Sequence, residues 1–366
     1  MTQFPTVDPI PLPAPIWLFK VLHNLTFSLH LASVDLLIGG LVLALAFSLV
    51  GQKQPAGMIV HRLPTLMAFV INLGVPPLLF AQVLYGRALY TSSVLIGTFW
   101  IAVIFLLMAS YFGIYMAAKR ADERRSWVAP GIAALLLVLT IAFIYSNNMT
   151  LMLRPQVWPA MYRGSPAGFQ LNTGDPTLLA RWLFFLAGAF PVTGAALALM
   201  ALRPGLGEDT GRFLTRGGGA VVAGGILLQG AFADLAIAAQ PRAIFSKVME
   251  DRVYGGFAYG WVGVSVLLFA LGLLAVALSA NKKAGRLIAI GAAVVAFLNV
   301  ASIVMVRDGI RDFTLRAVGF EVWDRQVATN WSVVGIFLVL FVAALGAAGY
   351  FISVIAKARR MEERYA

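Results

Sequence analysis

Apolar stretches of roughly 20 residues, the length that crosses a bilayer as a helix, recur along this chain from its beginning to its end. These stretches are continuous, whereas the strands of a membrane β-barrel alternate apolar and polar residues. The sequence therefore predicts an all-α fold, namely a polytopic integral membrane bundle of helices.

The apolar runs predict about nine transmembrane helices in one membrane domain that covers residues 1–366. Composition agrees, because 60% of the residues are hydrophobic, 12% are charged and the mean hydropathy is +0.85. These values are far from those of a water-soluble domain. The predicted spans are residues 23–50, 62–85, 93–117, 127–147, 178–202, 217–239, 256–280, 285–306 and 331–356.

The distribution of positive charge predicts how the bundle is oriented. Most of the 28 lysines and arginines fall in the short connections and the tail that share one side of the membrane. Because short cytoplasmic loops are rich in Lys and Arg, we expect the N-terminus outside and the C-terminus inside a bacterial inner membrane. The long connections 148–177, 240–255 and 307–330 are then outside, and residues 1–22 form an N-terminal interfacial segment.

Charge and cysteine content exclude several functions. The formal charge of +12 is divided among short loops instead of forming one face, so nucleic acid is not an expected partner. The chain has no cysteine, which excludes disulfides, thiol catalysis, iron–sulfur ligation and covalently attached c-type haem. Hydrolase and P-loop motifs are absent from the sequence. A redox cofactor would have to be held non-covalently.

Few ionisable residues fall inside the apolar runs, and each is a candidate functional group because charge is costly at membrane depth. The first run contains His23, His30 and Asp35. At about 100° per residue, His23 and His30 share one helix face roughly 10.5 Å apart, too far for both to bind one iron. One histidine could bind a metal while the other holds an acidic group of the same cofactor. Asp35 points about 140° away from His30 and needs a partner on another helix.

A single-histidine haem site is the arrangement to consider. The third histidine, His61, is expected at the opposite edge of the membrane, too far from His30 to share one haem. His30 is then the iron ligand, and Met305 is one candidate for the opposite position. The structural alternatives are hydrogen-bonded packing for His30, interfacial positions for His23 and His61, and ordinary packing for Met305. Other polar residues of the spans could be interhelical hydrogen-bonding groups, namely Asn72, Gln82, Asn147, Asn148, Gln229 and Asp234.

The first run has a histidine followed by a glycine-containing apolar stretch, SLHLASVDLLIGGLVLALAF. This segment resembles the first helix of subunit I in the cytochrome bd quinol oxidase superfamily, which has nine spans and an outside N-terminus. The resemblance places the family's haem histidine at His30. The next run, VINLGVPPLLFAQVLYGRALYTSSVLIG, resembles the family's second helix, with Gln82 where the family has a glutamate.

Other segments resemble the family but depart from its ligands. A segment similar to the fifth helix has Phe184 about where the family's low-spin haem histidine is expected. The connection AQPRAIFSKVMEDRV resembles the quinol-binding loop, with Lys247 and Glu250 at a different spacing. The eighth span retains Met305 and Arg307 without the family's motif. The resemblance implies a divergent paralogue.

These features favour an inner-membrane electron-transfer subunit that binds at least one haem b through His30, with quinone as a further candidate cofactor. Electrons would be exchanged with quinol or an outer c-type cytochrome, so the chain is expected to be part of an oxidoreductase complex. Its other partners are membrane lipid and further subunits. The candidate residues for a quinol or proton pathway are Asp35, Gln82, Asp234, Lys247, Glu250 and Arg307. The alternative is a haem-free scaffold, or a proton or ion transporter that uses His30 and Asp35.

Overall fold

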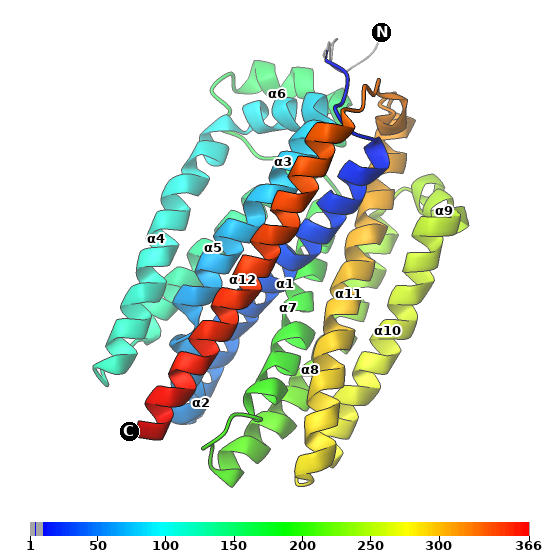
Figure 1. Cartoon of the computed structure of the whole chain (residues 1–366). Helices are drawn as coiled ribbons and strands as arrows, with labels where there is room; N and C mark the ends of the chain where they lie inside the picture. Colours follow the sequence, from blue (N-terminus) through cyan, green and yellow to red (C-terminus); the bar gives the residue numbers. More distant parts are fainter. Residues whose placement is uncertain (1–3, 5–9, 366) are drawn as a thin grey trace.

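The computed structural model describes residue 4 and residues 10–365, which form a bundle of long helices (Figure 1). Among the described residues, nine helices are long and apolar enough to cross a membrane, which confirms the predicted all-α membrane fold. The helices are α1 (Ile16–Leu49), α2 (Lys53–Val60), α3 (Leu63–Leu95), α4 (Gly97–Asp122), α5 (Val128–Leu151), α6 (Trp158–Gly164), α7 (Leu178–Met200), α8 (Glu208–Ala239), α9 (Arg242–Glu250), α10 (Arg252–Ala277), α11 (Lys282–Ala317) and α12 (Trp331–Tyr365).

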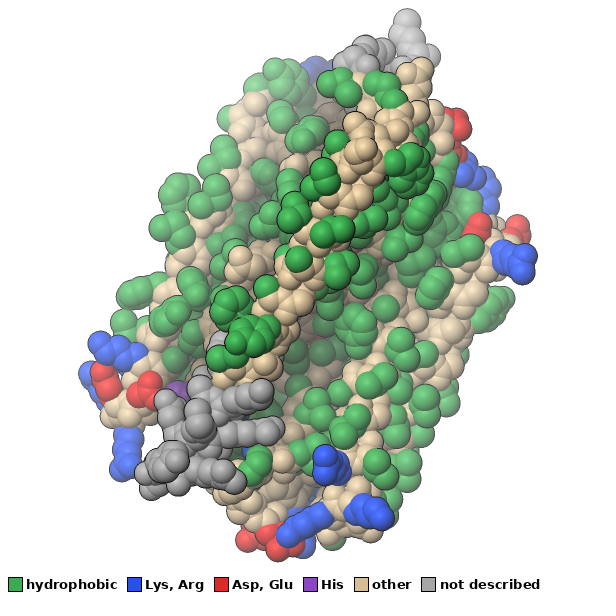
Figure 2. All heavy atoms as spheres, in the orientation of Figure 1, with side chains coloured by type: hydrophobic (Ala, Val, Ile, Leu, Met, Phe, Trp, Pro, Cys, Tyr) green, Lys and Arg blue, Asp and Glu red, His purple; other side chains and the backbone are tan. Residues whose placement is uncertain are grey.

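The two ends of the bundle differ. Helix α1 begins at the end that also carries the short helices α6 and α9, which we call the loop-rich end (Figure 1). Helix α12 begins there and finishes at the opposite end, near α2. On the face shown in Figure 2, hydrophobic side chains cover the length of the bundle and charged side chains gather at its two ends, as lipid contact requires. The orientation relative to the cell stays a prediction.

Several helices are longer than the apolar runs that predicted them, and in two of them, α1 and α11, the extension carries buried charges. Helix α1 begins at Ile16, within the expected interfacial segment 1–22, of which residues 1–3 and 5–9 lie outside the described part. Helix α11 continues to Ala317, so the beginning of the expected outer connection 307–330 is helical. The additional turns contain buried charged residues that pair with one another. Hydropathy scores each charge separately, so it began the first span too late and ended the eighth span too early.

Glycines bring α7, α8 and α10 close together in the half of the bundle away from the loop-rich end. A Cβ atom at Gly218 would lie 2.6 Å from the carbonyl oxygen of Gly194, and one at Gly219 would lie 2.5 Å from that of Gly272. No larger residue fits at these distances. Such close backbone contact is a common basis for helix association in lipid, where apolar side chains gain little from leaving the solvent.

Candidate functional site

Four charged side chains are buried together at the loop-rich end, namely those of Lys20, Asp308, Arg311 and Asp312. We call these four residues the charge cluster. The Nζ atom of Lys20 lies 2.6 Å from Oδ2 of Asp308 and 2.6 Å from Oδ2 of Asp312. Arg311 forms an ion pair with Asp308. Lys20 and Asp312, the most exposed members, are each only 5% exposed. Two cations and two anions leave the cluster neutral, which is how buried charges are tolerated.

Two tyrosines extend the charge cluster to further helices. The hydroxyl of Tyr85 on α3 lies 2.9 Å from Oδ1 of Asp312 and accepts a hydrogen bond from Lys20 Nζ at 2.7 Å. The hydroxyl of Tyr254 on α10 donates to Oδ2 of Asp312 at 3.0 Å. The guanidinium of Arg311 also lies 4.1 Å from the centre of the Tyr85 ring. The charge cluster therefore joins α1, α3, α10 and α11.

Local sequence explains why the α11 charges meet. Asp308 and Asp312 are four residues apart, and Arg311 follows Asp308 by three, so all three lie on neighbouring positions of one helix surface. Gly309 lies between them, where a Cβ atom would be 2.6 Å from Cγ of Tyr254. Glycine at this position therefore lets the Tyr254 ring approach α11 closely.

The hydrogen bonds of His23 fix its protonation state. Its Nδ1 lies 3.0 Å from the carbonyl oxygen of Pro77, and its Nε2 lies 2.9 Å from Nη2 of Arg311. A carbonyl only accepts and a guanidinium only donates, so Nδ1 carries the hydrogen and Nε2 accepts. Both ring nitrogens of His23 are occupied, and the side chain is an internal part of the site and not an interfacial group.

His30 differs from His23 because one of its ring nitrogens has no partner. Its Nδ1 lies 3.1 Å from the carbonyl oxygen of Val70, to which it can only donate. Its Nε2 makes no hydrogen bond to another described residue. The ring packs against Gly74, where a Cβ atom would lie 2.9 Å from Cε1 of His30. The side chain is half-buried, and its free nitrogen carries a lone pair.

Guanidinium donors without acceptors lie beside His23 and Phe27. Phe27 stands between the two histidines, with ring centroids 6.1 Å from His23 and 6.2 Å from His30. The guanidinium of Arg307 lies 4.6 Å from the Phe27 ring centre and makes no hydrogen bond or ion pair with another described residue. Arg311 buries its Nε and Nη1 atoms without an acceptor. Buried donors are costly when unpaired, so this place suits an anionic group.

Asp35 is buried near the middle of α1, away from the charge cluster. The hydroxyl of Thr193 on α7 donates to the backbone carbonyl of Asp35 at 3.0 Å. Its carboxyl group has no hydrogen bond or ion pair with another described residue, so the expected direct partner on another helix is not formed.

The remaining predicted residues lie apart from one another. Gln82 on α3 and Met305 on α11 are half-buried. His61 is at the end opposite to the charge cluster, with its Nδ1 3.2 Å from Oδ1 of Asp122. Three of the candidates for a quinol or proton pathway are exposed, namely Asp234, Lys247 and Glu250. Of the pathway candidates, Arg307 is the one that the fold brings to the histidines.

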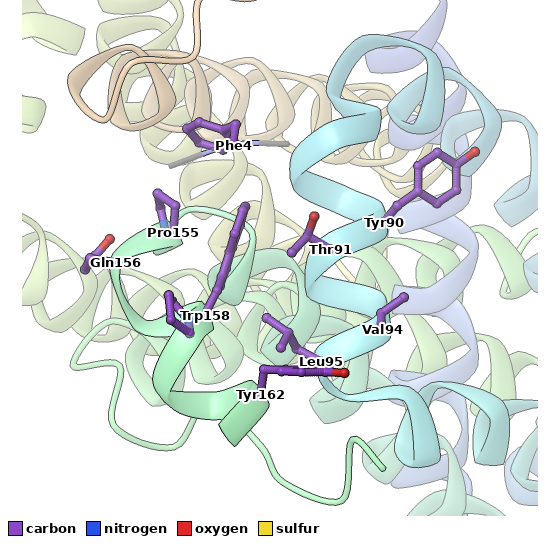
Figure 3. Close-up of a pocket in the computed structure, with 10 residues that line it drawn as sticks. Phe4, Tyr90, Thr91, Val94, Leu95, Pro155, Gln156, Trp158 and Tyr162 are labelled. Atoms are coloured by element: carbon purple, nitrogen blue, oxygen red, sulfur yellow. The ribbon is translucent and has the colours of Figure 1, made fainter. Parts of the chain in front are cut away.

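An open hollow of about 680 Å³ lies between the end of α3 and the segment around α6. Figure 3 shows Trp158, Leu95 and Phe4 around this space, with Tyr90 and Tyr162 at its margin. The residues that line it include no ionisable acid or base other than tyrosine. It is therefore an apolar recess at the loop-rich end and is separate from the charge cluster.

Sequence reasoning missed all four residues of the charge cluster. Lys20 fell in the expected interfacial segment, and Asp308, Arg311 and Asp312 fell in the expected outer connection. The signal that could have found the α11 residues is the spacing of RDGIRD, which puts two acids and a base on one helix face. Tyr85 and Tyr254 carry no comparable signal, because tyrosines are common near membrane surfaces.

The arrangement of helices has a known counterpart. No family model matches the chain, and no curated protein matches its sequence. The fold is a helical membrane bundle of the kind found in bd oxidase. One similar solved structure is that of bd oxidase from Geobacillus thermodenitrificans, with a TM-score of 0.70 and 11% sequence identity. The match covers 92% of this chain and 97% of that chain. At this identity the likeness shows the fold alone.

Proposed function

We propose that this chain is a haem-b-binding electron-transfer subunit of a respiratory membrane complex, with His30 as the iron ligand. The bd oxidase fold supports the general class, and the sequence resemblance marks His30. The observation that carries the proposal is the state of the His30 ring, which has one nitrogen fixed by a backbone carbonyl and the other free.

The surroundings of His30 suit a metal-bound imidazole. A histidine that binds a metal through one nitrogen usually donates the other N–H to a carbonyl or carboxylate, which fixes the ring. The Val70 carbonyl serves this purpose here. Within the described residues, no three His, Asp or Glu side chains are placed to hold a bare metal ion, whereas haem needs a single protein ligand. Met305 stays a candidate for the opposite position.

The unpaired guanidinium donors would hold the acidic side chains of the same cofactor. The sequence suggested that His23 could do this, but its Nε2 accepts a hydrogen bond from Arg311 and has no N–H to offer. Arg307 offers donors beside the Phe27 ring, and Arg311 offers donors beside His23. Guanidinium groups bind carboxylates through parallel hydrogen bonds, so the role passes from His23 to the arginines.

Bound haem would supply an iron that changes between ferrous and ferric states and so carries one electron. The chain itself would orient the ring through His30 and balance its acidic groups through Arg307. The electron partner in this proposal is quinol or a c-type cytochrome at the loop-rich end. There the helix α9 exposes Lys247 and Glu250, the residues that the quinol-loop resemblance marks.

A reduced-minus-oxidised spectrum of the purified full-length chain, with a pyridine haemochrome assay, tests the proposal. We expect b-type haem in the wild type and in His61→Ala, and its loss in His30→Ala. Arg307→Met should retain less haem at limiting supply, because a charge-assisted hydrogen bond contributes about 1.5–3 kcal/mol. Arg252→Met, at an exposed arginine, is the matched control.

Two results would contradict the haem assignment. A wild-type protein without haem would favour the alternative of a transporter that uses His30 and Asp35. Haem that persists in His30→Ala and disappears in His61→Ala would move the ligand to the other end of the bundle.

A further inference from the structure

Asp35 is a buried acid outside the charge cluster, and unlike the acids of the cluster it has no ion-pair partner among the described residues. This residue is 3% exposed and is about 28 Å from the Ile16 end and about 21 Å from the Leu49 end of α1, close to mid-membrane. Its carboxyl group has no hydrogen bond or ion pair with another described residue. An unpaired carboxylate at this depth is costly, which favours the neutral acid.

Gln229 of α8 reaches the same place from the other side. It is 2% exposed, and its Oε1 atom is buried without a hydrogen-bond partner. Both side chains approach Gly188 of α7, where a Cβ atom would lie 2.8 Å from Nε2 of Gln229 and 3.9 Å from Oδ2 of Asp35. Glycine at this position therefore leaves room for the acid and the amide on the same side of α7. A protonated carboxyl donates its O–H, and an amide oxygen accepts it.

The chemistry of this pair suits a proton better than a metal ion. A divalent cation takes several oxygen ligands, whereas one carboxyl and one amide lie beside Gly188. His30 on the same helix points about 140° away from Asp35. The charged groups nearest to Asp35 along each helix around it lie toward the helix ends, namely Lys20 on α1, Arg87 on α3, Arg181 on α7, Arg216 and Asp234 on α8, and Arg286 and Arg307 on α11.

A line of buried polar residues leads from Asp35 toward the loop-rich end. At about 100° per residue, Lys20, Asn24, Ser28 and Asp35 fall within roughly 80° of one another around α1. All four are buried. The hydroxyl of Ser28 donates to the backbone carbonyl of Asn24 at 2.7 Å, and the amide of Asn24 donates to Asp308 at 3.2 Å. Beyond Asp35 the helix continues as LLIGGLVLALAF, without a polar side chain.

We propose that Asp35 and Gln229 form a proton-binding site in the middle of the membrane, which exchanges its proton with the loop-rich end along the polar face of α1. The apolar second half of α1 offers no equivalent route to the opposite end. The site does not depend on haem.

Infrared spectroscopy of the full-length chain in lipid vesicles tests the site. The C=O stretch of a protonated carboxylic acid is separate from the amide bands and shifts in D2O. We expect such a band at neutral pH, its loss in Asp35→Asn and its shift in Gln229→Leu, which removes the amide that the proposal pairs with the acid. Asp209→Asn, at an exposed acid of the same helix as Gln229, should leave the band unchanged.

If Asp35→Asn does not fold, Asp35→Glu keeps the acid and should move the band to a different frequency. A band that survives in Asp35→Asn, or that stays at the same frequency in Asp35→Glu, would overturn the assignment. A missing haem signal in the separate visible spectrum would leave this infrared result unaffected.

The rate at which the band shifts after transfer to D2O tests the route. Ser28→Val interrupts the polar face and should slow exchange by about tenfold, the effect of losing one hydrogen bond. Ser33→Val is the matched control, because its hydroxyl donates to the Leu29 carbonyl on the opposite face of α1. Equal exchange rates in the two variants would disprove the route.

Discussion

The two halves of the bundle are held together by different forces. At the loop-rich end, four buried charges and two tyrosines join α1, α3, α10 and α11. In the other half, glycines let α7, α8 and α10 approach until backbone meets backbone. The first arrangement depends on complete pairing, because each charge is stable only while its partners are present. The second depends on shape, so each contact contributes separately.

The largest effect is expected from Asp308→Asn, which removes one anion from the charge cluster. Lys20 keeps Asp312, but Arg311 loses its ion-pair partner at 4% exposure. Breaking a buried pair on one side costs about 3–5 kcal/mol. Chemical denaturation of the protein in detergent measures this loss.

A neutral replacement sharpens that result. The double variant Lys20→Met with Asp308→Leu removes one cation and one anion together, so the remaining Arg311 and Asp312 balance. It should be less destabilised than Asp308→Asn, because a buried ion pair can often be replaced by apolar residues. Equal destabilisation would show that the cluster acts through shape and not through charge.

A smaller effect is expected from Gly219→Val in the glycine-packed half. The new side chain would meet the carbonyl of Gly272 on α10, and overpacking costs about 1–3 kcal/mol. Gly224→Val on the same helix is the control, because nothing lies within 4 Å of a Cβ atom there. The same denaturation assay applies, and equal stability of the two variants would contradict the packing role of Gly219.

The smallest effect is expected from Lys247→Ala, which removes an exposed charge at the loop-rich end. Substitutions of exposed residues rarely change stability. The denaturation midpoint should match that of the wild type, which would show that burial, and not the presence of charge, makes the cluster important. A shift as large as that of Gly219→Val would contradict this distinction.

The helices were predictable from sequence because each membrane-spanning helix needs apolar residues within its own stretch of the chain. Each span needs its own run of apolar residues, and that run can be recognised without knowing the neighbouring helices. The candidate residues of the first span were found in the same way, since His30 and Asp35 are conspicuous in an apolar run. The periodicity of a helix was enough to show that His23 and His30 share one face.

The charge cluster was not predictable by that reasoning because its pairing is not local. Lys20 and Asp312 are 292 positions apart and meet only after the bundle has formed. Taken one at a time, each charge indicates the end of a span, which is why α1 and α11 were predicted too short. Only the cross-helix partner turns such a residue into a stable part of the membrane interior.

The depth of Asp35 has an electrical consequence. Moving one charge across the whole membrane changes its free energy by about 2.3 kcal/mol per 100 mV. A proton that travels between the loop-rich end and Asp35 crosses about half of the membrane, so its free energy changes by roughly 1 kcal/mol per 100 mV. Proton occupancy at the proposed site would therefore change several-fold when the membrane potential changes by 100 mV. The charge cluster, being neutral and compact, would barely respond to the same voltage.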